Sequence, residues 1–154
     1  MILWRISNYA DLLGIGALYA SARWHTAGQP VVYLAESPSS ALLEVFVHLE
    51  TDEDHRPDSY QLLKIETDDS LPFETVELAS LSPAWMSNES ETQQRGDMWL
   101  AGKQTALLRV PSVITPETWN WILNPRHPDA GKMRIIQAEM HSYDTRLFRR
   151  ATSK

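Results

Sequence analysis

A short β-rich run followed directly by a capped apolar helix constrains the fold of this sequence more than any other stretch. Residues 31–35 (VVYLA) are too few for a helix and are rich in β-formers, which predicts a buried strand. Ser37 then suits an N-cap, and Pro38 suits the first helical position. The apolar residues that follow recur at helical spacing: Leu42, Val45, Phe46 and Leu49. These signals predict a strand, a turn and a helix over residues 38–50.

One carboxylate, Glu44, lies inside this apolar helix. A buried charge costs several kcal/mol unless it is paired or hydrogen-bonded, so the protein must either pair Glu44 or use it for chemistry. On the helix surface Glu44 shares its face with Ser40, Ala41, Val47 and His48, which makes a narrow and partly polar stripe. A pocket wall would have this composition, and so would a helix edge where Glu44 meets solvent.

The rest of the chain predicts a sheet-rich domain. Further strands are expected at residues 2–7, 60–66, 73–78, 105–110 and 135–140. A second helix is expected at residues 85–102, with Asn88 as its cap and Gly96 weakening its middle, and a single helical turn at residues 9–13. Strands outnumber helices and do not alternate regularly with them. This pattern favours an α+β fold, with a mixed β-sheet core flanked by helices.

Length and charge narrow the functional classes. A chain of 154 residues predicts one domain, here residues 1–148, followed by a basic tail at 149–154. The net charge of -6 argues against a general nucleic-acid binder, and residues 51–58 are expected to form an acidic surface loop. The start of the chain lacks a signal-peptide pattern, and no apolar run approaches a membrane span, so the expected location is the cytoplasm.

Common catalytic motifs do not occur. Without cysteine there is no disulfide, thiolate nucleophile or cysteine-based zinc site, and the five histidines lack metal-ligand spacing. There is no Walker loop, no G-x-G-x-x-G and no G-x-S-x-G. The six tryptophans are expected mainly in the core. Chemistry must therefore come from other side chains.

Several short pieces occur together in one order along the chain: Arg23, the strand at 31–35, the capped helix with Glu44, Val110-Pro111-Ser112, and Leu123-Asn124-Pro125-Arg126-His127-Pro128. As a set, they resemble the RES domain, a family named for an arginine, a glutamate and a serine. The resemblance runs from Trp4 to about residue 148. It implies that Arg23, Glu44 and Ser112 are the name-giving residues and that Tyr33 is the tyrosine of the pocket. The family often has Arg-Trp-Asn where this chain has Arg23-Trp24-His25.

The resemblance implies a function as well as a fold. RES proteins are typically toxins of bacterial toxin–antitoxin pairs, with an Xre-like helix-turn-helix antitoxin as partner and a fold similar to that of ADP-ribosyltransferase toxins. They consume NAD by hydrolysis or phosphorolysis, or transfer ADP-ribose to a protein. The implied substrate is NAD, with no permanently bound cofactor, no metal, and a hetero-oligomer formed with the antitoxin.

The residue types fit such chemistry. Cleavage of the nicotinamide–ribose bond passes through an oxocarbenium-like sugar, which a carboxylate such as Glu44 can stabilise. Arg23 can bind a pyrophosphate through bidentate hydrogen bonds, and Tyr33 could stack on nicotinamide or ribose. Ser112 could orient Glu44 or the ribose, and Asn124 completes the expected binding residues. These are the candidate site residues.

Each assignment has a structural rival. Arg23 could form a surface ion pair, Tyr33 could belong to the core, and Ser112 could be a turn residue. The chain could also be a catalytically silent module that binds a nucleotide or a protein. A nucleic-acid binder that uses the basic tail is a further alternative, which the acidic net charge disfavours.

Overall fold

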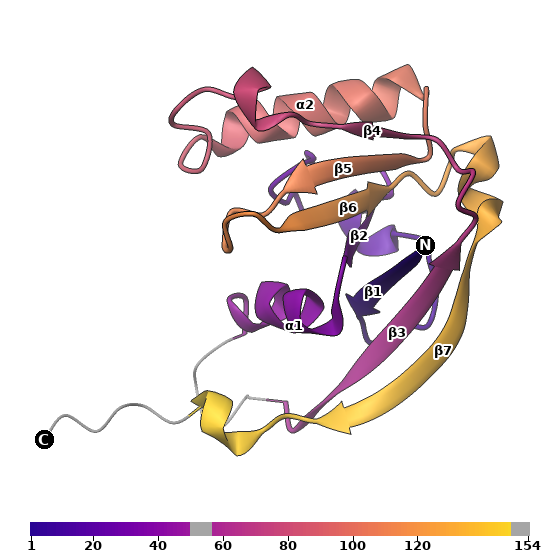
Figure 1. Cartoon of the computed structure of the whole chain (residues 1–154), viewed down its shortest axis with the longest axis vertical. Helices are drawn as coiled ribbons and strands as arrows, with labels where there is room; N and C mark the ends of the chain where they lie inside the picture. Colours follow the sequence, from indigo (N-terminus) through magenta and orange to yellow (C-terminus); the bar gives the residue numbers. More distant parts are fainter. Residues whose placement is uncertain (50–56, 149–154) are drawn as a thin grey trace, which may run out of the picture.

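One mixed sheet of seven strands organises the protein in a computed structural model that describes residues 1–49 and 57–148 (Figure 1). The strand order across the sheet is β4-β5-β6-β2-β1-β3-β7. The strands are β1 (Ile2–Ile6), β2 (Val32–Ala35), β3 (Ser59–Thr67), β4 (Phe73–Thr75), β5 (Leu107–Pro111), β6 (Trp119–Leu123) and β7 (Met133–Ser142). Strands β4 and β5 pair in parallel and the other neighbours are antiparallel.

Two helices and four 3-10 turns complete the described part of the chain. They are α1 (Pro38–Phe46), α2 (Glu89–Gly102), η1 (Ile15–Leu18), η2 (Leu78–Ser80), η3 (Pro128–Lys132) and η4 (Thr145–Phe148). Figure 1 shows α2 lying along the β4–β5–β6 part of the sheet, while β3 and β7 run away from it as a long curved pair. This arrangement confirms the expected α+β architecture.

The alternation of side chains along each strand gives the sheet two cores. One face joins strand residues Val32, Leu34, Leu107 and Leu123 to Leu63 and Ile65 of β3. The other face joins Leu108, Val110 and Ile122 to Trp99 and Leu100 of α2. Because successive strand residues point to opposite faces, Tyr33 lies on the α2 face, where it packs against the second core.

Helix α1 begins as predicted and ends early. The Ser37 hydroxyl accepts a hydrogen bond from the Ser40 backbone N–H at 3.0 Å, which confirms the N-cap. The prediction of helix to residue 50 is wrong, because the chain tightens after Phe46. The N–H of His48 bonds to the Val45 carbonyl and that of Leu49 to the Phe46 carbonyl, which is 3-10 geometry.

Helix α2 starts later than predicted, and its glycine has a different role. Asn88 is the N-cap, and residues 85–87 form turns before it rather than helix. A Cβ at Gly96 would lie 1.6 Å from the Trp24 carbonyl oxygen. Gly96 therefore allows the loop that contains Trp24 to contact the backbone of α2, which helix propensity alone does not reveal.

Other differences are local. The expected helical turn at residues 9–13 is wrong: Arg5 donates to the Asp11 carbonyl, and the nearby helical turn is η1, which begins after Gly14. Gly14 has φ of 65°, and its carbonyl accepts from Val31. The predicted acidic loop lies largely outside the described residues, as does the tail at 149–154. No helix in the described ranges is both long and apolar enough to cross a membrane.

Candidate functional site

Glu44 on α1 is held by two donors from the neighbouring strands. The Ser112 hydroxyl donates to Glu44 Oε1 at 3.1 Å, and the Asn120 side-chain amide donates to the same oxygen at 2.6 Å. Glu44 is half-buried, so these bonds compensate part of its lost hydration. Both bonds end on Oε1, and neither occupies Oε2. The structure thus brings Glu44 and Ser112 together, as the orienting role of Ser112 requires.

Ser112 is also a turn residue. It follows β5, and its hydroxyl oxygen accepts the backbone N–H groups of Ile114 at 3.1 Å and Thr115 at 3.2 Å. A hydroxyl has one hydrogen and two acceptor positions, so these two bonds leave its hydrogen to point at Glu44. The turn role and the orienting role are therefore two parts of one arrangement.

Asn120 is the residue that the sequence analysis missed. It lies in β6, opposite Ala35 of β2 and Val110 of β5. Its Oδ1 atom is buried and has no hydrogen-bond partner among the described residues. One signal was available in the sequence: a lone amide between Trp119 and Trp121 in a strand that is otherwise apolar.

Arg23 is anchored on one side only. Its Nη2 donates to the Met86 carbonyl at 2.9 Å, while Nη1 is buried without a partner in the part of the chain that the structure describes. The Thr92 hydroxyl donates to the Arg23 carbonyl at 2.6 Å and so ties this loop to α2. The partner of the guanidinium is a carbonyl, so Arg23 keeps donor capacity for an anion.

Tyr33 uses its hydroxyl inside the protein. The Trp24 backbone N–H donates to the Tyr33 oxygen at 3.1 Å, and the hydroxyl lies 2.9 Å from His25 Nδ1. Burial raises the pKa of Tyr33 above its ordinary value, and the negative charges of Asp97 and Glu89 raise it further against the opposing effect of the Trp24 N–H. The phenol therefore stays neutral at physiological pH.

The register of the strands puts these residues on one face. Tyr33 is opposite Ile122 and Ala35 is opposite Asn120, and directly opposed residues point to the same side of a sheet. Tyr33 and Asn120 are thus diagonal neighbours on the α2 face. The bond from Trp24 to Tyr33 brings the Arg23 loop to the same side.

A hollow of about 230 Å³ adjoins this group, and we call it the Ser112 hollow. It includes Ser112, which bonds Glu44, and Met86, which accepts from Arg23. The remaining lining is mainly apolar: Leu78, Trp85, Pro111, Val113, Pro116, Glu117, Thr118 and Trp119. Its volume is below the roughly 300–1,000 Å³ of pockets that enclose whole drug-sized ligands. It suits one aromatic ring rather than a complete dinucleotide.

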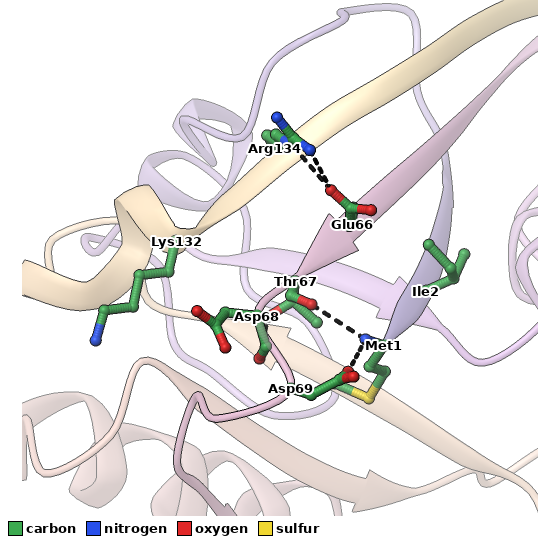
Figure 2. Close-up of a pocket in the computed structure, with 8 residues that line it drawn as sticks. All are labelled: Met1, Ile2, Glu66, Thr67, Asp68, Asp69, Lys132 and Arg134. Carbon is green, nitrogen blue, oxygen red and sulfur yellow. Dashed lines mark hydrogen bonds and ion pairs between the residues drawn. The ribbon is translucent and has the colours of Figure 1, made fainter.

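A larger hollow of about 570 Å³ contains none of the candidate residues, and we call it the Met1 hollow. Figure 2 shows its lining of Met1, Ile2, Glu66, Thr67, Asp68, Asp69, Lys132 and Arg134. The N-terminal amino group pairs with Asp69 and Arg134 pairs with Glu66 at 2.6 Å, while Lys132 pairs with Asp129 at 2.8 Å. Its cations are therefore already neutralised.

Asn124 is not brought to Glu44. It follows β6 at the end opposite Asn120, four residues on, which is about 13 Å at the usual rise of a strand. Asn124 is 4% exposed, and its Oδ1 accepts the Arg126 N–H at 3.0 Å within the irregular segment that the prolines predict. This is the geometry of a turn, and the assignment of Asn124 to ligand binding stays a prediction.

Comparison with known proteins gives consistent matches. The family model described as the RES domain matches residues 2–146. The chain is 48% identical over 148 residues to "Toxin Res" of Pseudomonas putida, covering 96% of this chain and 100% of that protein. It is 35% identical over 159 residues to "Prs ADP-ribosylating toxin" of Sphingobium sp., covering 96% of this chain and 97% of that protein.

One solved structure has a similar fold. It is a chain in the crystal structure of the M. tuberculosis MbcT–MbcA toxin–antitoxin complex, with a TM-score of 0.72 over 92% of this chain and 84% of that one. At 18% identity this match speaks for the fold alone. It agrees with the mixed sheet and two helices described above.

Proposed function

This chain belongs to the RES domain family, and we propose on that premise that it is the toxin of a bacterial toxin–antitoxin pair that cleaves the nicotinamide–ribose bond of NAD. The proposal draws on the names of the relatives and on the chemistry of the Glu44 group. A catalytically silent nucleotide-binding module on the same fold is the alternative.

One observation carries the proposal: the Glu44 carboxylate is oriented through Oε1 by Ser112 and Asn120, which leaves Oε2 for a ligand. When the nicotinamide–ribose bond breaks, nicotinamide leaves with the bonding electron pair as a neutral molecule. Positive charge then develops on the ribose carbon and ring oxygen. A preorganised carboxylate stabilises that charge and can also accept a hydrogen bond from a ribose hydroxyl.

The neighbouring groups supply binding. The buried Nη1 of Arg23 lacks a partner among the described residues, and a pyrophosphate oxygen would satisfy it. The Ser112 hollow suits the nicotinamide ring. Tyr33 does not line this hollow, but it packs against the core cluster that includes Trp85, which does. Since the Tyr33 phenol is neutral and hydrogen-bonded internally, we assign it contact rather than proton transfer.

The acceptor of the ribosyl group distinguishes three reactions on this site. Water gives ADP-ribose and releases a proton, phosphate gives a phosphorylated ADP-ribose, and a protein side chain becomes ADP-ribosylated. The name of the Sphingobium relative favours protein modification as the second candidate. All three release nicotinamide and require the same carboxylate.

The partner proposed for this toxin is an antitoxin of the Xre-like helix-turn-helix type. The toxin–antitoxin complex that contains the structural neighbour supports an antitoxin in general, and the Xre type follows from the family resemblance. If a helix-turn-helix protein is encoded beside this gene, co-expression with it tests the proposal, because a neutralising partner restores growth and co-purifies.

The deciding experiment incubates the purified protein with NAD and measures nicotinamide, with phosphate, without phosphate, and with a cell lysate. Release that depends on Glu44 supports the enzyme, and the product separates the three acceptors. If no nicotinamide appears under any condition while the protein is folded, the silent module is the better account.

A further inference from the structure

His25 lies in the loop between Arg23 and β2 with both ring nitrogens engaged. The side chain is only 2% exposed. Its Nε2 is 3.0 Å from the Ala20 carbonyl oxygen, and its Nδ1 is 2.9 Å from the Tyr33 hydroxyl. The ring therefore joins the segment before Arg23 to the strand that follows it.

The partners determine where the hydrogens are. A carbonyl only accepts, so Nε2 must carry a hydrogen, and the neutral ring then presents a lone pair at Nδ1. The Tyr33 hydroxyl must donate to that lone pair, because a ring nitrogen without a hydrogen can only accept. The hydroxyl oxygen accepts the Trp24 N–H at the same time. This is consistent with the raised pKa of Tyr33, which keeps its hydrogen.

We propose that His25 is a positioning residue: by accepting the Tyr33 hydrogen at Nδ1, it fixes the Tyr33 ring and couples it to the loop that carries Arg23. The hydroxyl then has no hydrogen left for a substrate, and Tyr33 acts through its ring. The consequence for NAD rests on the proposed function, whereas the hydrogen-bond arrangement does not.

The loop has other attachments, so a substitution of His25 need not release it. Ala22 and His25 exchange two backbone hydrogen bonds. Thr26 bonds to Asp97 of α2 through its backbone N–H at 3.0 Å and its hydroxyl at 2.8 Å. The Trp24 N–H also joins the loop to the Tyr33 oxygen, so what His25 adds is an acceptor for the Tyr33 hydrogen.

The first test uses the wild-type protein without NAD. Nitrogen NMR of labelled histidine reports the tautomer, and we expect hydrogen on Nε2 together with a slowly exchanging Tyr33 hydroxyl proton. Hydrogen on Nδ1, or a Tyr33 hydroxyl that exchanges freely, would overturn the proposal whatever the enzyme activity proves to be.

A matched pair of variants separates the two ring nitrogens. In His25→Asn the amide oxygen can take the position of Nδ1, whereas in His25→Gln the longer side chain can reach the position of Nε2 but not that of Nδ1. We expect His25→Asn to keep the protected Tyr33 hydroxyl proton and His25→Gln to lose it. Circular dichroism shows whether each variant is folded, and the reverse pattern in folded variants contradicts the proposal.

The functional test is a double-mutant cycle on nicotinamide release. We expect His25→Gln to lower kcat/KM about tenfold, as loss of a buried hydrogen bond does, and His25→Asn to restore most of it. In a Tyr33→Phe background, which lacks the hydroxyl, His25→Gln should add nothing. Additive effects would show that His25 acts by another route, while absence of nicotinamide release in the wild type would count against the proposed function and leave the NMR result standing.

Discussion

The Ser112 hollow and the Met1 hollow differ in whether their polar groups are already paired. The Met1 hollow is the larger, yet its cations each face a carboxylate, with Arg134 on Glu66 as an example. Beside the Ser112 hollow, Arg23 and Asn120 each keep a buried polar atom without a partner among the described residues. Because buried polar atoms are normally satisfied, unpaired atoms indicate a ligand site better than volume does.

Arg109 and Arg23 differ in the same way, by whether the guanidinium charge is already paired. Arg109 also has a buried unpaired nitrogen, but its guanidinium lies 4.2 Å from the Trp119 ring centre and 3.4 Å from Glu36. Its charge is thus used within the fold. Arg23 has a carbonyl partner instead, so its charge remains available to an anion.

The largest expected effect is on nicotinamide release, and it compares Glu44, which is bonded to Ser112, with Glu66 at the Met1 hollow. Glu44→Gln keeps an acceptor for Ser112 and Asn120 but loses the negative charge, so nicotinamide release should fall at least about 100-fold in a folded protein. The matched control is Glu66→Gln, which removes an exposed ion pair at the Met1 hollow and should leave release unchanged. Equal turnover in both variants would refute the role of Glu44.

The next effect is on stability and uses two glycines. Gly96→Ala places a methyl group against the Trp24 carbonyl and should lower the free energy of unfolding by about 2 kcal/mol. Gly131→Ala, beside Lys132 at the Met1 hollow, meets nothing within 4 Å and should change it by less than about 0.5 kcal/mol. Urea denaturation measures both, and similar values would mean that α2 and the loop do not lie so close.

A smaller effect concerns binding by arginine. Arg23→Ala removes the proposed pyrophosphate contact and should weaken NAD binding about tenfold, measured by calorimetry in a Glu44→Gln background that suppresses turnover. Arg134→Ala in the same background is the control and should leave the affinity unchanged, since Arg134 is committed to Glu66. If Arg23→Ala left the affinity for NAD unchanged, the proposal that Arg23 contacts the pyrophosphate would be wrong.

The smallest effect is electrostatic and confined to the Met1 hollow. The hydrogen bond from Lys132 lowers the pKa of Asp129, so this pair stabilises the fold above the ordinary carboxyl pKa and loses that contribution as pH falls through the depressed value. Lys132→Met should move the pKa of Asp129 back up toward 3.8, as read by NMR titration. Nicotinamide release at neutral pH should not change, and a loss would connect this hollow to function.

Local signals in the sequence predicted the local parts of the fold. Ser37 and Asn88 cap their helices as expected, and five strands lie close to their predicted ranges. The strand predicted at 73–78 is shorter, because β4 ends at Thr75 and a 3-10 turn begins at Leu78, and β6 (Trp119–Leu123) was not predicted as a strand. The end of α1 was misjudged, because the apolar pattern continues beyond Phe46 while the backbone tightens into 3-10 geometry. Gly96 was misjudged for a different reason: the carbonyl that it accommodates lies about 70 positions away in the chain.

The candidate site likewise divides into residues that the sequence identified and contacts that only the fold reveals. The family pattern led to Arg23, Tyr33, Glu44 and Ser112, and the strand register places Tyr33 beside Asn120. The lone amide between Trp119 and Trp121 marks Asn120 in the sequence but not its partner. The bond from Asn120 to Glu44 and the bonds of His25 depend on which elements pair and which residues face each other, and no single-sequence pattern contains that information. Asn124 is near Asn120 in sequence but at the other end of the same strand.

The two side chains that donate hydrogen bonds to Glu44 come from late in the chain: Ser112 lies 68 residues after it and Asn120 lies 76 residues after it. During translation, the first third emerges from the ribosome with Arg23, Tyr33 and Glu44 but without the strands that orient the acid. Assembly must wait until β5 and β6 have been made, β6 has paired with β2, and β5 has paired with β6. If the proposed function holds, a nascent chain lacks the oriented carboxylate through most of its synthesis, and products truncated before β6 are expected to be inactive.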